Sequence, residues 1–144
     1  MEELFCRKLR ADQNCYGELN VKSKISLFGH LIYEWLSTFA PTYRGVLPAG
    51  VKPASVYLKI GGYADDFATQ FIFPVQIYTL NTTSYGSVAL IADEIGNAIG
   101  KGGMLLSDEG IRVKIEKGSP YYQDKDDEDE TVRAGYVNLL ITIY

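Results

Sequence analysis

The spacing of the hydrophobic residues switches along the chain between a helical and a strand-like period, and this alternation limits the chain to folds that mix helices with a sheet. From Ser23 to Ala40, apolar residues recur at intervals of three and four, as one face of an α-helix requires. They are Ile25, Phe28, Leu31, Ile32, Trp35, Leu36 and Phe39, with His30, Glu34 and Ser37 opposite. Pro41 is expected to end this helix.

A second helix is predicted from Tyr85 to Ile99. Its apolar stripe consists of Val88, Ile91, Ala92, Ile95 and Ile99. The polar run from Asn81 to Ser84 offers side chains that can cap its first turn. Gly100 and the glycines that follow are expected to end it. Leu90 falls on the polar side of this helix, beside Asp93 and Glu94.

Alternating or β-rich stretches predict strands. They run from Val56 to Ile60, Thr69 to Thr79, Ile111 to Lys117 and Val132 to Tyr144. In the second of them Phe71, Phe73, Val75 and Ile77 share one face, while Ile72 and Tyr78 lie on the other. Apolar groups on both faces indicate a central or covered strand. Pro74 cannot donate to a ladder and predicts an edge or a bulge at that point.

The order of these elements predicts an α+β fold. It is a four-stranded, mostly antiparallel sheet with two helices packed on one face, because that arrangement buries both helical stripes. The stretch from Pro41 to Pro53 contains many prolines and glycines and is predicted to be a loop. A chain of 144 residues suits one domain, here residues 23–144, preceded by a short helical N-terminal appendage at residues 1–22.

Composition narrows the function classes. The net charge is −4, with 8 basic and 7 acidic residues in positions 1–72 but 6 basic and 11 acidic residues in positions 73–144. This is not the basic footprint of a nucleic-acid-binding protein. The N-terminus has acids where a signal peptide needs basic residues, and no apolar run approaches a membrane span, so we expect an intracellular protein without membrane contact. Cys6 and Cys15 are expected to be free thiols.

The residues that could carry catalysis do not form a recognisable motif. His30, the only histidine, falls on the polar side of a helix, where a solvated histidine is the ordinary interpretation. The glycines from Gly96 to Gly103 close a helix and lack the spacing of a phosphate-binding loop. Asp65 and Asp66 are adjacent and are expected in a turn. No catalytic, cofactor-binding or metal-binding residue is therefore predicted, and no cofactor.

Six acids lie within seven residues near the C-terminal end. They are Asp124, Asp126, Asp127, Glu128, Asp129 and Glu130. The run lacks the glycine and the bidentate acid of a calcium-binding EF-hand loop. We expect a solvated hairpin tip that could serve as an acidic contact loop, with a cation site as the alternative.

Several stretches, taken together with the order of elements, carry a family resemblance over residues 25–144. They are Phe73-Pro74-Val75-Gln76-Ile77-Tyr78, Ile91-Ala92-Asp93-Glu94-Ile95, Lys117-Gly118-Ser119-Pro120-Tyr121-Tyr122-Gln123 and Val132-Arg133-Ala134-Gly135-Tyr136-Val137-Asn138-Leu139. In these the sequence resembles the tail terminator and tail-completion proteins of long-tailed phages and prophages. The resemblance implies a structural virion protein, made in the bacterial cytoplasm, that forms a typically hexameric ring on the tail tube. Its partners would be other copies of itself, the tail tube protein and the head–tail connector protein.

Some apolar residues have no obvious place in the core of a lone domain and are candidates for subunit contacts. They are Ile72, Tyr78, Leu90, Pro120, Tyr121 and Tyr122. Three other interpretations stay open. The chain could be another neck or minor capsid component, an unrelated interaction domain of similar fold, or a small ligand-binding or enzymatic domain with a pocket under the loop from Thr42 to Ala54.

We predict that the purified protein carries no stoichiometric transition metal. One histidine and two cysteines are fewer than the four nitrogen and sulfur ligands of a structural zinc site, and both cysteines fall in the predicted appendage, away from the histidine. Elemental analysis of the purified chain should find far less than one such ion per molecule, and about one zinc or iron per chain would contradict the prediction.

Overall fold

The computed structural model describes residues 24–50, 52–61, 70–108 and 110–144. The predicted appendage at residues 1–22, both cysteines and the pair Asp65 and Asp66 lie outside the described residues.

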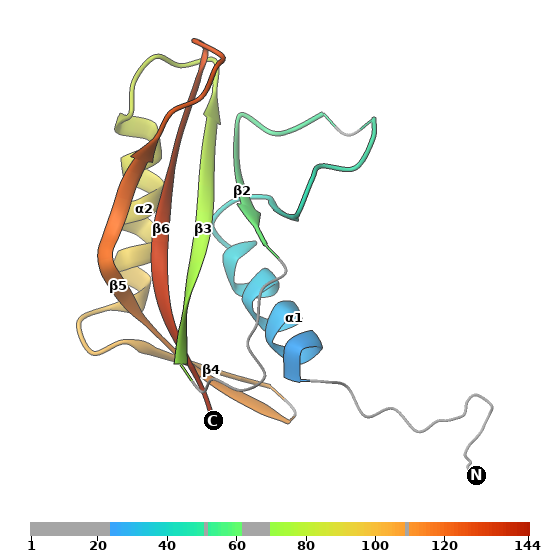
Figure 1. Ribbon diagram of the computed structural model, residues 1–144, viewed down its shortest axis with the longest axis vertical. Helices are drawn as coiled ribbons and strands as arrows, with labels where there is room; N and C mark the ends of the chain where they lie inside the picture. Colours follow the sequence, from blue (N-terminus) through green and yellow to red (C-terminus); the bar gives the residue numbers. More distant parts are fainter. Residues whose placement is uncertain (1–23, 51, 62–69, 109) are drawn as a thin grey trace, which may run out of the picture.

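The described residues form a mixed, mostly antiparallel sheet that curls into a half-barrel (Figure 1). Its strands are β1 (Thr42–Arg44), β2 (Val56–Ile60), β3 (Gln70–Leu80), β4 (Met104–Asp108), β5 (Ile111–Lys125) and β6 (Val132–Ile143). Their order across the sheet is β1-β2-β3-β6-β5-β4, and only β1 and β2 pair in parallel. The predicted α+β class is confirmed.

The predicted number of strands was wrong, since the described residues contain six rather than four. The two additional strands are the sheet's edges, and both are short. β1 lies inside the stretch predicted as a loop, where three residues pair with β2. β4 follows the glycines that end the second helix and pairs with β5. β1 has only three residues, and the Met-Leu-Leu-Ser-Asp sequence of β4 does not alternate between apolar and polar side chains.

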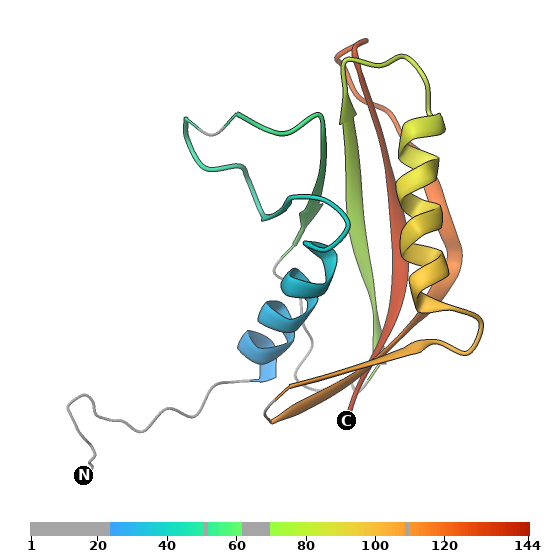
Figure 2. The same ribbon diagram turned by 180° about the vertical axis from the view of Figure 1, so that it is seen from behind.

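Both helices, α1 (Lys24–Leu36) and α2 (Gly86–Ile99), lie on the same side of the sheet, as predicted (Figure 2). The Phe28 ring of α1 meets the rings of Phe71 and Phe73 edge to face, with centroids 5.5 and 5.3 Å away. α2 covers β3, β6 and part of β5, whereas α1 contacts β1, β4 and β5. No helix in the described ranges is both long and apolar enough to cross a membrane.

The first helix ends at Leu36, four residues before the predicted end at Ala40. Two side chains bond to carbonyl groups of its last turn. The Ser37 hydroxyl donates to the Tyr33 carbonyl oxygen at 2.8 Å, and the Thr38 hydroxyl donates to the Trp35 carbonyl oxygen at 2.6 Å. Such local bonds compete with helix propagation and favour a turn.

The predicted boundaries of α2 are close to those observed. The N–H of Gly86 donates to the Ser84 hydroxyl oxygen at 3.1 Å, so the polar run does satisfy a backbone group at the helix start. At the other end Gly100 has φ 75°, a positive value that glycine adopts most readily. Its N–H donates to the Gly96 carbonyl oxygen at 3.0 Å.

β3 is a central strand, flanked by β2 and β6, as its two apolar faces predicted. Its pairing with β2 extends only to Val75, which faces Ile60 and directly follows Pro74 in the sequence. β3 therefore has no β2 neighbour at Pro74, which is the local edge that this proline predicted.

The segment from Pro120 to Gln123, predicted to lie between strands, belongs to β5. The register of β5 against β6 shifts between Lys117 and Tyr122, and the Asn138 side-chain amide donates to the Pro120 carbonyl oxygen at 3.0 Å within this irregular stretch. After the shift, Tyr122 faces Val137, a residue of the helix-covered face. The bulge thus turns the tyrosine toward α2.

Gly135 of β6 leaves the space that Tyr122 occupies. A Cβ atom at Gly135 would stand 2.8 Å from Tyr122 ring and hydroxyl atoms and 2.9 Å from a Val88 methyl group. These separations are too short for non-bonded carbon atoms. The close approach of β5, β6 and α2 at this point therefore requires glycine.

We predict that Gly135→Ala destabilises the fold by about 1–3 kcal/mol, the usual cost of overpacking a core. Gly102→Ala is the matched control, because a Cβ there would meet nothing within 4 Å. Urea denaturation monitored by circular dichroism measures both. In a Tyr122→Ala background the cost of Gly135→Ala should shrink, and an undiminished cost would place the strain elsewhere.

Candidate interaction surface

One face of the sheet carries neither helix, and we call it the outer face. β3 contributes Ile72, Pro74, Gln76 and Tyr78, which face Leu140, Asn138, Tyr136 and Ala134 of β6. Residues paired across antiparallel strands share a face. Phe71, Phe73, Val75 and Ile77, by contrast, are buried beneath the helices. The predicted division of β3 into two faces is confirmed.

The outer face has an apolar spot toward one end, formed by Ile72, Pro74 and Leu140. Ile72 retains 48% of its surface, Pro74 is exposed and Leu140 is partly buried. Ile72 and Leu140 are direct cross-strand partners, so their side chains lie side by side. An apolar pair in water on a helix-free face is the type of surface at which subunits associate.

Aromatic rings cross the other end of the outer face. Tyr57 of β2 stacks on Tyr78 of β3 with centroids 5.0 Å apart and an interplanar angle of 11°. Tyr43 of β1 meets Tyr57 edge to face at 5.8 Å. The three rings cover one another, and Tyr78 is consequently only 8% exposed. The sequence placed Tyr78 on the correct face but not in a buried position.

Lys125 of β5 also contacts these rings, and we call Tyr43, Tyr57, Tyr78 and Lys125 the tyrosine row. Its Nζ donates to the Tyr78 hydroxyl at 2.8 Å and lies 5.1 Å from the centre of that ring. Gln76 accepts bonds from both the Tyr78 hydroxyl and Lys125, at 2.7 and 3.4 Å. Ala134 of β6 lies between Tyr78 and Lys125 in the register. Its small side chain leaves the lysine free to reach across the strand.

The tyrosine row lies near the acidic run. The pKa of the Tyr57 hydroxyl is raised, first because the group is partly buried, and then because Tyr78 and the Asp127 carboxylate act on it electrostatically. Lys125, which ends β5 next to Asp126 and Asp127, also bonds to Tyr78 of the row. The acidic run and the row form neighbouring parts of one end of the molecule.

The acidic run is the hairpin tip that the sequence predicted. Asp124 and Lys125 end β5, and the side chains of residues 126–131 are exposed. The tip is held by its own bonds. Asp127 accepts the Asp129 N–H at 3.0 Å, and one Asp129 oxygen accepts the N–H and the hydroxyl of Thr131 at 2.9 and 2.7 Å. These bonds to the carboxylate lower the pKa of Asp129.

The other candidate contact residues do not join the outer face. Tyr121 donates its hydroxyl proton to the Ala92 carbonyl oxygen of α2 at 2.7 Å, and burial raises its pKa well above the usual range. Burial and a 2.6 Å bond to Asp124 do the same for the pKa of Tyr122. Leu90 is 59% exposed, on α2 and therefore in the helical layer. The exposed Pro120 lies in the β5 bulge. The six candidates thus occupy different parts of the molecule.

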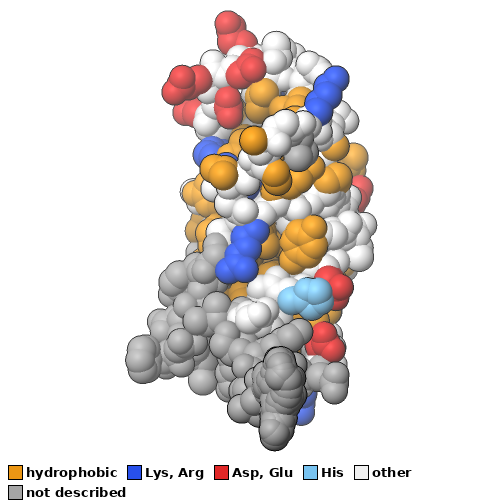
Figure 3. All heavy atoms as spheres, turned by 90° about the vertical axis from the view of Figure 1, so that its right-hand side faces the viewer, with side chains coloured by type: hydrophobic (Ala, Val, Ile, Leu, Met, Phe, Trp, Pro, Cys, Tyr) orange, Lys and Arg blue, Asp and Glu red, His pale blue; other side chains and the backbone are white. Residues whose placement is uncertain are grey.

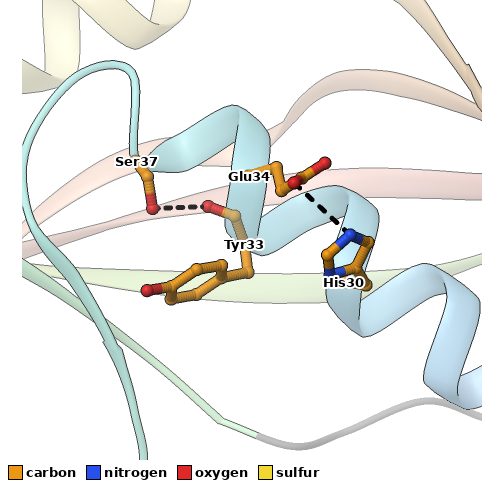
Figure 4. Close-up of polar contacts among 4 residues, drawn as sticks. All are labelled: His30, Tyr33, Glu34 and Ser37. Atoms are coloured by element: carbon orange, nitrogen blue, oxygen red, sulfur yellow. Dashed lines mark hydrogen bonds and ion pairs between the residues drawn. The ribbon is translucent and has the colours of Figure 1, made fainter.

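His30 lies on the exposed side of α1, as expected (Figure 4). Its Nε2 is 3.4 Å from a Glu34 carboxylate oxygen one turn along the helix, and the two side chains are 61% and 60% exposed. The described residues contain no cluster of three potential metal ligands.

A shallow hollow of about 310 Å³ lies at the turn between β4 and β5. It is lined by Asp108, Gly110, Ile111, Arg112 and Tyr144. This hollow does not lie under the loop from Thr42 to Ala54, where the ligand-binding alternative placed a pocket. The tyrosines and the aspartate with shifted pKa values lie elsewhere.

Sequence reasoning missed most of the tyrosine row. Tyr43 was predicted to lie in a loop and Lys125 in the acidic run. Tyr57, and Tyr136 on the same face, were predicted to lie in strands, but the strands that pair with them were not predicted. The Tyr136 hydroxyl donates to the Gln123 side chain across β6 and β5. The available signal was alternation along each strand. Leu58 follows Tyr57 and Val137 follows Tyr136, so each tyrosine lies on the other face of its strand from a core residue.

Comparisons with known proteins establish the fold and nothing finer. No family model matches the sequence, and no curated protein matches it. A solved structure superimposes with a TM-score of 0.54 over 81% of this chain and 90% of its own, at 16% sequence identity. At that identity the likeness concerns the fold alone, and the name of that protein describes no activity.

We predict that Lys125→Met lowers the free energy of unfolding by about 1 kcal/mol, because it removes a hydrogen bond and a cation–π contact from the tyrosine row. Lys101→Met, in the exposed turn after α2, is the control and should change stability by less than about 0.5 kcal/mol. Chemical denaturation measures both. Equal stabilities would show that the row is not held by Lys125.

Proposed function

We propose that this protein is a structural subunit that forms a ring on the end of a phage tail tube, stops tube growth and prepares the tail for joining to the head. The observation that carries the proposal is the outer face, a broad helix-free sheet surface with the apolar pair Ile72 and Leu140. The resemblance of residues 25–144 to tail terminator proteins implies the partners of the protein, which are other copies of itself, the tail tube protein and the head–tail connector protein.

A ring of identical subunits needs two different surfaces on each chain, one of which meets the other on the next copy. The outer face supplies one such surface without opening the core, since the helices already cover the opposite face. The circumference of the ring would then be formed by subunit contacts, and its two flat sides would meet the tail tube and the connector. This work requires shape and charge complementarity rather than catalysis.

The decisive experiment measures capping. Tail tube subunits encoded beside the same gene are polymerised with and without the protein, and tube lengths and end rings are measured by electron microscopy. The proposal expects shorter tubes with a ring at one end. Tubes of unchanged length, with no protein bound at their ends, would refute it. Binding to the connector but not to the tube would indicate another neck component.

We predict that Ile72→Asp weakens ring formation at least about tenfold, because a buried, unpaired charge at a contact costs more than about 1.4 kcal/mol. Leu90→Asp introduces the same charge at a comparably exposed leucine of the helical layer and should leave capping intact. Circular dichroism verifies that both variants fold. The reverse pattern would move the contact to the helical layer.

A further inference from the structure

The segment between β1 and β2 projects from the body as an arm, formed by residues 45–50 and 52–55 (Figures 1 and 2). Backbone bonds fix both ends. The Gly45 N–H donates to the Ile60 carbonyl oxygen, and the Leu80 N–H donates to the Ser55 carbonyl oxygen, each at 2.8 Å. Gly45 and Gly50 turn the chain with φ values of 75° and 80°. The two ends of the arm are therefore held against β2 and β3.

The arm carries an apolar side chain that is almost fully in water. Val46 is 82% exposed, more than any other large hydrophobic side chain of the described residues. Its neighbour Leu47 is only partly buried. A single exposed valine is common, but here it lies on an anchored projection rather than on the body. The arm is therefore shaped to make a contact outside its own domain.

The strand pair that carries the arm and the acidic tip have opposite charges. Residues 42–61 include Arg44, Lys52 and Lys59 and no acid, a net charge of +3. Residues 124–130 hold six acids and Lys125, a net charge of −5. The ion pairs His30–Glu34 and Lys114–Glu116 lie in other elements, and neither joins the arm to the tip. Each chain thus offers both halves of a complementary contact.

The acidic tip also adjoins an apolar surface that could receive the arm. It borders the tyrosine row of the outer face, and the apolar spot lies farther along the same strands. Figure 3, which views the side of α1 and the arm rather than the outer face, shows acidic side chains gathered at the upper end of the molecule. The arm carries Lys52 and the exposed Val46 between strands that add Arg44 and Lys59, so it matches an acidic rim beside a sheet with apolar side chains in both charge and polarity.

We propose that the arm of one subunit docks on the acidic tip and outer face of a second copy of this chain, with Lys52 toward the tip and Val46 toward the sheet. The proposal rests on the ring function proposed above and names its subunit contact. The contact joins two different surfaces, so it can repeat head-to-tail around a closed ring, as the proposed function requires.

A charge exchange tests the contact. Lys52→Glu or Glu128→Lys alone should weaken self-association at least about fivefold, the scale of one exposed ion pair at each contact. Both side chains are exposed, and the chosen acid is not one of those that bond the turn of the tip. Sedimentation of the full chain over a range of concentrations, at low and high salt, measures association.

Mixing the two variants is the sharper measurement. In an equimolar mixture, an alternating ring places the arm of the Lys52→Glu variant on the tip of the Glu128→Lys variant, whose net charge is −3 instead of −5, and every other contact pairs a native arm with a native tip. The mixture should therefore associate more strongly than either variant alone. Lys101→Glu and Glu94→Lys, at exposed sites outside both surfaces, are the controls and should associate normally. Salt should reduce the native association.

The outcomes separate this inference from the proposed function. If the native protein forms rings that cap tubes but the mixture of variants associates no more strongly than either variant alone, the arm contact is overturned and the proposed function stands. A mixture that restores association of a protein that never caps tubes would support the contact and refute the function. Val46→Asp gives an independent check, since full association of that variant would overturn the apolar half of the contact.

Discussion

The ladder between β3 and β6 is the constraint on which the rest of the structure depends. It runs without interruption from Gln70 opposite Thr142 to Leu80 opposite Val132. Because side chains alternate along both strands, this register fixes which residues face the helices and which do not. A slip of β3 by one residue would expose Phe73 and bury Gln76. The core and the outer face are therefore two consequences of one register.

Two small residues of β6 allow neighbouring elements to approach the ladder on both faces. Gly135 admits Tyr122 and Val88 on the helical side, and Ala134 lets Lys125 reach Tyr78 on the outer side. These residues are adjacent in sequence, so one short stretch of β6 serves both layers. Bulkier side chains there would push β5 and α2 away from β6. They would also break the hydrogen bond between Lys125 and Tyr78 in the tyrosine row.

The periodic spacing of hydrophobic residues made the two helices and β3 predictable, whereas the sequence did not show which strands pair with one another. The stripes of α1 and α2 and the alternation of β3 follow from local chemistry, so their positions and faces were correct. β1 and β4 exist only because a longer neighbour binds them, and their sequences contain no repeated signal. The burial of Tyr78 depends on Tyr57 and Lys125, which come from distant segments. The orientation of Tyr122 depends on a register shift that no local pattern announces.

The chemistry of the outer face disfavours unspecific association. Most of the polar groups at its tyrosine end already bond to one another, as Tyr78, Gln76 and Lys125 do. Its exposed large hydrophobic side chains are few and separate, with Ile72 on β3 and Leu105 on β4, where Leu105 faces Lys114. Such a face gains little from unspecific collapse, because most of its groups are either satisfied or hydrated. Stable association then requires a partner that matches both the small apolar spot and the acidic tip, which favours one geometry over many weak ones.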